Sequence, residues 1–156
     1  MTEDETRQVL EENERNTIMC VCDALRDYGK LKHSHLVEFI ASLCGVDVKE
    51  ILSSSKDIDT VHARWMYFYA CRYMTNETYE KIGKYPLEMN GKSYTPTGVA
   101  ACIDKMYSLM ENQPIWRKRW TIIKRIIKES NGTLVEPPTR MTITVPKNVE
   151  LTIKKE

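Results

Sequence analysis

Two short motifs in the second half of the sequence mark the beginnings of helices. Thr95-Pro96 and Gln113-Pro114 each place a polar residue directly before a proline. This order is typical of a helix N-terminus, because a polar side chain can cap free backbone N–H groups and proline fits the first helical position. Apolar residues recur at helical spacing after each motif, as far as about Glu111 and Ser130. The motifs therefore predict two successive helices.

The first half of the chain also has helical periodicity. Gly29, Gly45 and Gly83 each follow such a stretch and indicate where a helix ends. Asp47 opens a short helical segment, and Glu50 is placed to complete a capping box with it. The first dozen residues are almost entirely polar, so we expect that end of the first helix to fray or to project. The helices predicted in this half cover residues 2–28, 34–44, 47–52, 57–74 and 78–82.

The C-terminal residues have a different period. Apolar residues alternate with other residues over 141–145 and again over 149–153, on either side of Pro146-Lys147-Asn148. This pattern predicts a β-hairpin. Two strands alone are marginally stable in water, so we expect them to pack on the helices or on another copy. The predicted fold is mostly α-helical, with an acidic N-terminal helix (residues 1–30), a helical domain (31–130) and a β-hairpin tail (131–156).

Charge is distributed unevenly along the chain. The 156 residues carry a formal net charge of only +1. Residues 1–50 hold 6 lysines and arginines against 11 aspartates and glutamates, whereas residues 51–130 hold 13 against 8. An acidic first part joined to a basic second part predicts that only the second part meets a polyanion.

No arrangement of residues indicates catalysis, a metal site or a cofactor. Gly91-Lys92-Ser93 is similar to the end of a phosphate-binding loop, but Leu87 stands where that loop requires glycine. Cys20 and Cys22 would face different sides of a helix, and the five cysteines are expected to be reduced, mostly buried thiols. No apolar run approaches the roughly 20 residues of a membrane span, and the acidic start is unlike a signal peptide. We expect a non-enzymatic, cytoplasmic protein.

A short helix, a turn and a second helix with a polar beginning lie within the basic segment. In a helix-turn-helix protein the second helix enters the major groove, and residues near its N-terminus reach the base edges. Here those residues are Thr95, Thr97 and Gly98, and Ala101 and Lys105 follow on the same exposed side. Threonine can hydrogen-bond a base or touch a thymine methyl group. The alternative is a capped surface helix with no ligand.

Residues 37–127 resemble the C-terminal DNA-binding domain of the bacterial replication initiator DnaA. The resemblance rests on a short capped helix, an arginine that opens a long helix, a Thr-Asn turn, an Ile-Gly pair and a Thr-x-Val start of the recognition helix. In this chain these are Asp47-Val48-Lys49-Glu50-Ile51-Leu52, Arg64, Thr75-Asn76, Ile82-Gly83 and Thr97-Gly98-Val99. Two features differ from the family. Tyr94-Thr95-Pro96 replaces Arg-Asp-His, and the loop before the recognition helix is about four residues longer.

The resemblance implies a DNA-docking mode without the ATPase module of the family. Arg64 matches the arginine that reaches into the minor groove, and Thr97 matches a threonine that contacts bases. Lys84 and Lys92 fall in the longer loop, where they could meet phosphates. Because the Arg-Asp-His residues are replaced, we expect this chain to read a different DNA sequence. The candidate DNA-contacting residues are Arg64, Lys84, Lys92, Ser93, Thr95, Thr97, Gly98, Ala101 and Lys105.

Two further sets of side chains have alternative interpretations. The spacing of Trp65, Phe68, Tyr69 and Tyr73 favours core packing over a platform for stacking bases, and Trp116, Trp120, Ile123 and Ile127 form a second packing stripe. The opposite side of that last helix is either a solvated face or a flank contact with DNA, and it carries Arg117, Lys118, Arg119, Lys124, Arg125 and Lys128.

The sequence therefore predicts a non-catalytic protein that binds double-stranded DNA. It would act as a replication accessory or a transcription regulator, with a phage or mobile element as one possible source, and it would join the nucleoid when bound. The alternative is a protein-interaction or assembly module that kept the helices and lost DNA binding. In that case the N-terminal helix or the β tail would pair with a second copy or a partner.

Overall fold

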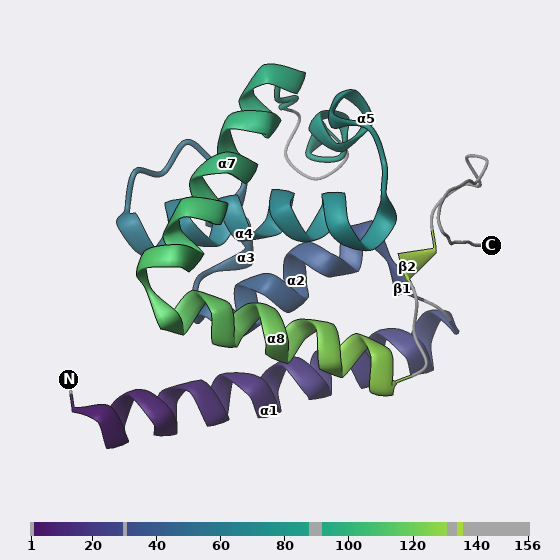
Figure 1. The fold of residues 1–156 in the computed structure, drawn as a ribbon. Coiled ribbons are helices and arrows are strands. Elements are labelled where there is room, and N and C mark those ends of the chain that lie inside the picture. The colour runs from purple at the N-terminus through teal and green to yellow at the C-terminus, as the bar shows by residue number, and fades with distance from the viewer. Residues whose placement is uncertain (1, 30, 88–91, 131–133, 136–156) are drawn as a thin grey trace, which may run out of the picture.

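The computed structural model describes residues 2–29, 31–87, 92–130 and 134–135, and this part of the chain is mostly helical (Figure 1). Its elements are α1 (Glu3–Tyr28), β1 (Leu31–Lys32), α2 (His33–Cys44), α3 (Val48–Ile51), α4 (Ile58–Thr75), α5 (Tyr79–Lys84), α7 (Pro96–Asn112), α8 (Pro114–Glu129) and β2 (Leu134–Val135). The helices expected from periodicity are all present. The expected hairpin lies outside the described residues.

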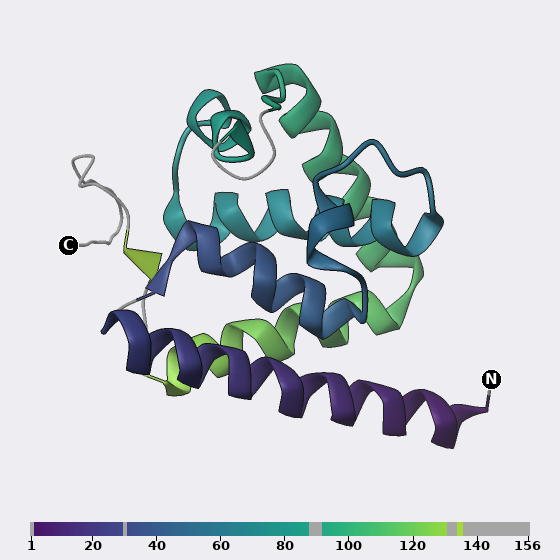
Figure 2. The same cartoon turned by 180° about the vertical axis from the view of Figure 1, so that it is seen from behind.

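Helix α1 is well formed to its first turn. The Thr2 hydroxyl accepts a hydrogen bond from the Glu5 backbone N–H at 3.1 Å, and the Glu5 carboxylate accepts one from the Thr2 N–H at 2.8 Å. This capping box satisfies two N–H groups that the helix itself cannot. Gly29 ends the helix with a φ of 75°, a conformation that glycine adopts without strain. The acidic amino end extends past the rest of the molecule (Figures 1 and 2).

Helix α4 forms the centre of the core, between α2 and α7. The spacing of its apolar residues places Met66, Tyr67 and Ala70 out of contact with solvent. Helix α1 shares this core, because its Val21 belongs to the same cluster of buried residues as Ile123 of α8. In both views α1 and α8 lie side by side along one edge, whereas α5 and the beginning of α7 lie at the opposite edge (Figures 1 and 2).

Two local details differ from the sequence expectation. The carboxylate of Asp47 accepts a hydrogen bond from the Lys49 N–H at 2.9 Å, so it caps α3 through the second residue of the helix and not through a capping box with Glu50. The strands β1 and β2 form a parallel pair of two residues each, which the sequence did not predict. Such a short pair has no alternating pattern to detect.

Candidate nucleic-acid interface

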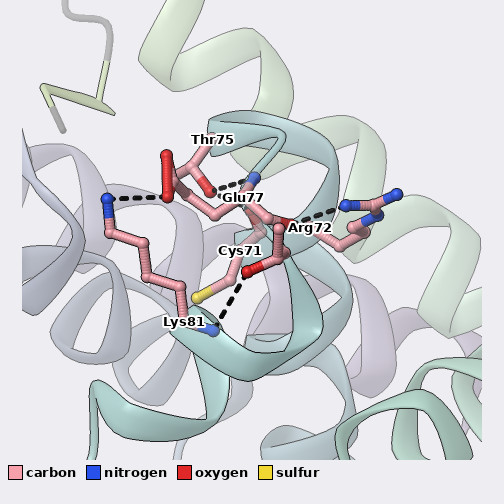
Figure 3. A network of polar contacts seen from close by, with 6 residues as sticks. Cys71, Arg72, Thr75, Glu77 and Lys81 are labelled. Atoms are coloured by element: carbon pink, nitrogen blue, oxygen red, sulfur yellow. Dashed lines mark hydrogen bonds and ion pairs between the residues drawn. The ribbon is translucent and has the colours of Figure 1, made fainter. Parts of the chain in front are cut away.

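The turn between α4 and α5 is held by a network of polar contacts (Figure 3). Asn76 adopts a left-handed conformation with a φ of 57°, which asparagine tolerates better than most residues. Arg72 donates to the backbone carbonyl of Glu77 at 2.6 Å, and Thr75 Oγ1 accepts from the Glu77 N–H at 3.3 Å. The Glu77 side chain is only 2% exposed and pairs with Lys81 at 2.8 Å. These contacts fix the direction of α5 relative to α4.

Gly83 lets α5 touch the chain that leads into α7. The Tyr94 N–H donates to the Gly83 carbonyl at 2.8 Å. A Cβ atom on Gly83 would lie 2.2 Å from the Tyr94 carbonyl oxygen, which no side chain can accept. Gly83 was expected to end the short helix, but α5 continues through it to Lys84. The glycine is therefore explained by close approach of two backbones and not by helix termination.

Tyr94 secures the start of α7 from a second direction. Its hydroxyl donates to the Leu52 carbonyl at 3.1 Å, and its ring meets the Phe68 ring edge-on with centroids 5.0 Å apart. Burial raises the pKa of the Tyr94 phenol. The residue that replaces the family arginine is thus a structural contact between α7, α3 and α4.

The amino end of α7 presents the residues predicted to reach DNA. The Thr95 hydroxyl accepts from the Gly98 N–H at 2.9 Å and caps the helix, while Pro96 occupies the first turn. Thr97, Ala101 and Lys105 are exposed and lie at i, i+4 and i+8, so they form one stripe. Val99, Ile103 and Met106 are buried on the other side of the helix. The exposed stripe and the hydroxyl of Thr95 are accessible to a ligand.

Arg64 lies beside this stripe but has structural partners of its own. The side chain is partly buried, its Nε donates to the Ile51 carbonyl at 2.8 Å and its Nη2 donates to the Ser55 carbonyl at 3.0 Å. The guanidinium is close enough to α7 to act on Cys102, whose thiol pKa is raised by burial and lowered in part by Lys105 and Arg64. Arg64 therefore fixes the link between α3 and α4. Sequence reasoning missed this because the carbonyl acceptors are distant in sequence.

The candidate DNA contacts that were expected in the loop, Lys84, Lys92 and Ser93, lie in different parts of the structure. Lys92 and Ser93 are exposed and lead directly into Tyr94. Lys84, expected in the loop, is the last residue of α5 and lies 3.8 Å from the Glu80 carboxylate in an exposed pair. Lys92, Ser93, Thr95 and Thr97 are thus exposed at the beginning of α7, on either side of the half-buried Tyr94.

The basic residues of α8 do not extend this segment, because α8 lies at the opposite edge of the molecule (Figure 1). Several of them contact other groups of the chain. Arg125 pairs with Glu14 of α1, and Arg117 donates to the Met110 carbonyl at the end of α7. The Arg119 guanidinium lies 4.6 Å from the centre of the Trp116 ring. A flank contact from α8 would therefore involve a separate face of the protein.

Residues 34–95 match the family model of the bacterial DnaA protein helix-turn-helix. The resemblance to DnaA is confirmed over this segment. The match is shorter than half of the 156 residues. It covers α2 to α5 and ends at Thr95, the N-cap of α7. The matched segment therefore supplies the scaffold that positions α7, whereas the exposed stripe of α7 lies beyond it. No curated protein and no solved structure matches the chain significantly.

Other kinds of site are not found among the described residues. No group of three or more histidine, cysteine, aspartate or glutamate side chains in this part of the chain is placed to hold a metal ion. None of the described helices is both long and apolar enough to cross a bilayer. The five cysteines are free thiols, of which Cys71 is buried, Cys20, Cys44 and Cys102 are half-buried and Cys22 is exposed, so the expectation of mostly buried thiols is met in part.

Proposed function

We propose that this protein binds double-stranded DNA without catalysis, with the amino end of α7 in the major groove. The observation that carries the proposal is the stripe of Thr97, Ala101 and Lys105, which is exposed on a helix whose start is fixed by a DnaA-type helix-turn-helix segment. Small side chains at Gly98 and Ala101 let the helix approach the base edges closely. Threonine hydroxyl and methyl groups supply the contacts that distinguish base pairs.

Phosphate contacts would come from the rim of this surface. Lys92 and Ser93 lie shortly before the start of α7, and Lys84 is the last residue of α5. All three therefore lie at the ends of the segment that leads into α7. Arg64 uses two of its five N–H donors on the carbonyls of Ile51 and Ser55. Its remaining donors would serve a contact in the adjacent minor groove. If the four cations of this surface, Arg64, Lys84, Lys92 and Lys105, each neutralise one phosphate, the logarithm of the binding constant would fall with the logarithm of salt concentration with a slope of roughly −3 to −4.

The experiment that tests this function is selection of binding sites from random duplexes, followed by titration of variants on the selected sequence. Thr97→Ala should weaken binding to that sequence by about 1–3 kcal/mol and relax the preference at one base position. Lys92→Ala should weaken binding to all duplexes about equally. Thr6→Ala is the matched control, because Thr6 lies on α1 at the opposite edge of the molecule. Equal affinity of Thr97→Ala and the wild type would refute the docking mode.

Arg64 needs a separate control because it also holds the fold. Arg64→Ala removes two hydrogen bonds from a charged donor, and each contributes on the order of 1.5–3 kcal/mol. Its unfolding must therefore be measured beside its DNA affinity. If DNA binding weakens only at temperatures where the variant begins to unfold, Arg64 acts on the scaffold alone.

A protein-interaction module remains the second candidate, and α1 is the observation that favours it. Glu3, Asp4 and Glu5 are exposed at an end that extends past the body of the protein. A basic partner surface would suit this acidic end. If no duplex is selected, and sedimentation shows a concentration-dependent complex that is lost when these three residues are replaced by alanine, the interaction role is favoured. The proposed DNA-binding role places the protein in the cytoplasm, in replication or transcription.

A further inference from the structure

A pocket of about 360 Å³ lies where α4, α7 and α8 meet. Its aromatic walls come from one residue of each helix: Tyr69 of α4, Tyr107 of α7 and Trp120 of α8. The Tyr69 and Trp120 rings meet edge-on with centroids 4.9 Å apart, and Tyr107 lies 6.4 Å from Tyr69. Tyr107 is 54% exposed. An aromatic residue this exposed at the rim of an aromatic pocket is available to a ligand.

Arg117 is the basic residue of the pocket lining, and two lysines follow it along α8. Arg117, Thr121, Lys124 and Lys128 follow one another at i, i+4, i+7 and i+11, and all four are exposed, so they form a stripe that begins in the pocket lining. The Lys124 ammonium lies 5.3 Å from the centre of the Trp120 ring. Arg117 and Thr121 also line the groove between α8 and α1, together with Lys118, Arg125 and Glu14, so the pocket and this groove share the beginning of the stripe.

We propose that this pocket binds a base of single-stranded nucleic acid, with the strand running along the α8 stripe. Sites for single strands combine a basic track for the backbone with aromatic rings on which bases stack, and both are present here. The volume lies at the lower end of the range for small-ligand pockets, which suits one base. An acidic peptide would use the same cations, but it offers no planar group for the three rings.

Glu111 adds selectivity to the proposed site. Glu111 belongs to the pocket lining, and its carboxylate can only accept hydrogen bonds when ionised. Glutamate accepts from the amino group of cytosine, whereas thymine has no amino group to offer. We therefore expect oligo-dC to bind more tightly than oligo-dT.

The pocket is separate from the proposed duplex site. Thr97 and Glu111 lie at opposite ends of α7, and 14 residues of α-helix at 1.5 Å per residue separate them by about 21 Å. The protein could therefore bind a single strand and a duplex at the same time. The two proposals stand on different residues, so either can fail without the other.

The test is fluorescence anisotropy of labelled dC12 and dT12 titrated with the full chain. Tyr107→Ala should weaken oligo-dC binding about 5- to 100-fold, the usual effect of removing one stacking residue, and should leave duplex binding unchanged. Tyr28→Ala is the matched control, since Tyr28 is 59% exposed on α1 and does not line the pocket. Lys124→Ala should make the salt dependence of oligo-dC binding shallower by roughly 0.7 in logarithmic slope.

Three outcomes would overturn the proposal. The first is that neither oligonucleotide binds at 50 mM salt. The second is that Tyr107→Ala binds oligo-dC as tightly as Tyr28→Ala does. The third is that polyglutamate displaces oligo-dC as well as unlabelled oligo-dC does, which would show a site for any polyanion. Circular dichroism of each variant confirms that the fold is intact, and Thr97→Ala, which belongs to the duplex site, should leave oligo-dC binding unchanged.

Discussion

Replacing Gly83 with alanine tests whether the contact between α5 and α7 positions the proposed recognition helix. The new Cβ would lie 2.2 Å from the Tyr94 carbonyl oxygen, about 1 Å inside the 3.4 Å at which ordinary van der Waals contact begins. It would also lie 3.3 Å from a methyl group of Val99. The nearest atom belongs to the backbone, so the strain cannot be relieved by a rotamer change. The two segments must move apart.

The expected change in the free energy of unfolding has three contributions. Overpacking a core typically costs about 1–3 kcal/mol. Loss of the 2.8 Å hydrogen bond from Tyr94 to Gly83 leaves buried groups unpaired, at about 1–3 kcal/mol. Alanine gains about 1 kcal/mol over glycine in helix propensity. The Gly83→Ala variant should therefore lose about 1–5 kcal/mol of unfolding free energy, measured by urea denaturation followed by circular dichroism.

Gly98→Ala is the control for this substitution. Its Cβ would meet only the Thr95 hydroxyl oxygen, at 3.1 Å, and the residue lies in the first turn of α7, so its stability should stay within about 1 kcal/mol of the wild type. Gly83→Ala should also weaken duplex binding at temperatures where it is folded, because the start of α7 is displaced. A Gly83→Ala stability within 0.5 kcal/mol of the wild type would show that this contact does not position α7.

The remaining stability predictions concern charged groups. Lys81→Met leaves the buried Glu77 carboxylate without its ion-pair partner and should lower the unfolding free energy, measured by urea denaturation, by about 2–3 kcal/mol. Lys84→Met breaks an exposed pair and should lower it by at most about 0.5 kcal/mol. Equal losses would refute the role assigned to burial. Burial lowers the pKa of His62, an effect that Asp59 opposes. The unfolded chain therefore takes up this proton first as pH falls through about 6.5, so stability should fall between pH 7 and pH 5.5. The stability of the His62→Gln variant should fall less between pH 7 and pH 5.5 than that of the wild type. An equal fall would contradict the assignment of this pH dependence to His62.

Local signals in the sequence were enough to place the helices. Thr95-Pro96 and Gln113-Pro114 predicted the starts of α7 and α8 to the residue. The Thr95 side chain caps α7, whereas the Gln113 side chain makes no capping hydrogen bond and the start of α8 rests on Pro114 at the first helical position. The face of α7 was also predictable, since burial of Val99 and Ile103 follows from the 3.6-residue period. The order of a short helix, a turn and a second helix with a polar beginning predicted a helix-turn-helix, and the match to the DnaA family model over residues 34–95 supports it.

What sequence reasoning missed depends on contacts between distant segments. Arg64 was taken for a cation available to DNA, but it donates to carbonyls 13 and 9 residues away. Tyr94 was taken only as a departure from the family, although its hydroxyl reaches a carbonyl 42 residues away. The aromatic pocket needs Tyr69, Tyr107 and Trp120 from three helices. No local pattern encodes such distances, because they are set by how the helices pack.

The arrangement of α1 explains why an almost neutral chain can still offer two basic surfaces. Glu14 of α1 pairs with Arg125 of α8, so the acidic helix neutralises the side of α8 that faces it. Arg117 and Thr121 share that groove with Glu14, whereas Lys124 and Lys128 continue the stripe beyond its lining, and the start of α7 lies at the opposite edge of the molecule. Because exposed charges separated by more than about 8–10 Å are largely screened at physiological salt, the negative charge of α1 acts mainly on its neighbour. The uneven charge of the sequence thus corresponds to a spatial separation in the fold, which leaves each proposed nucleic-acid surface its own cations.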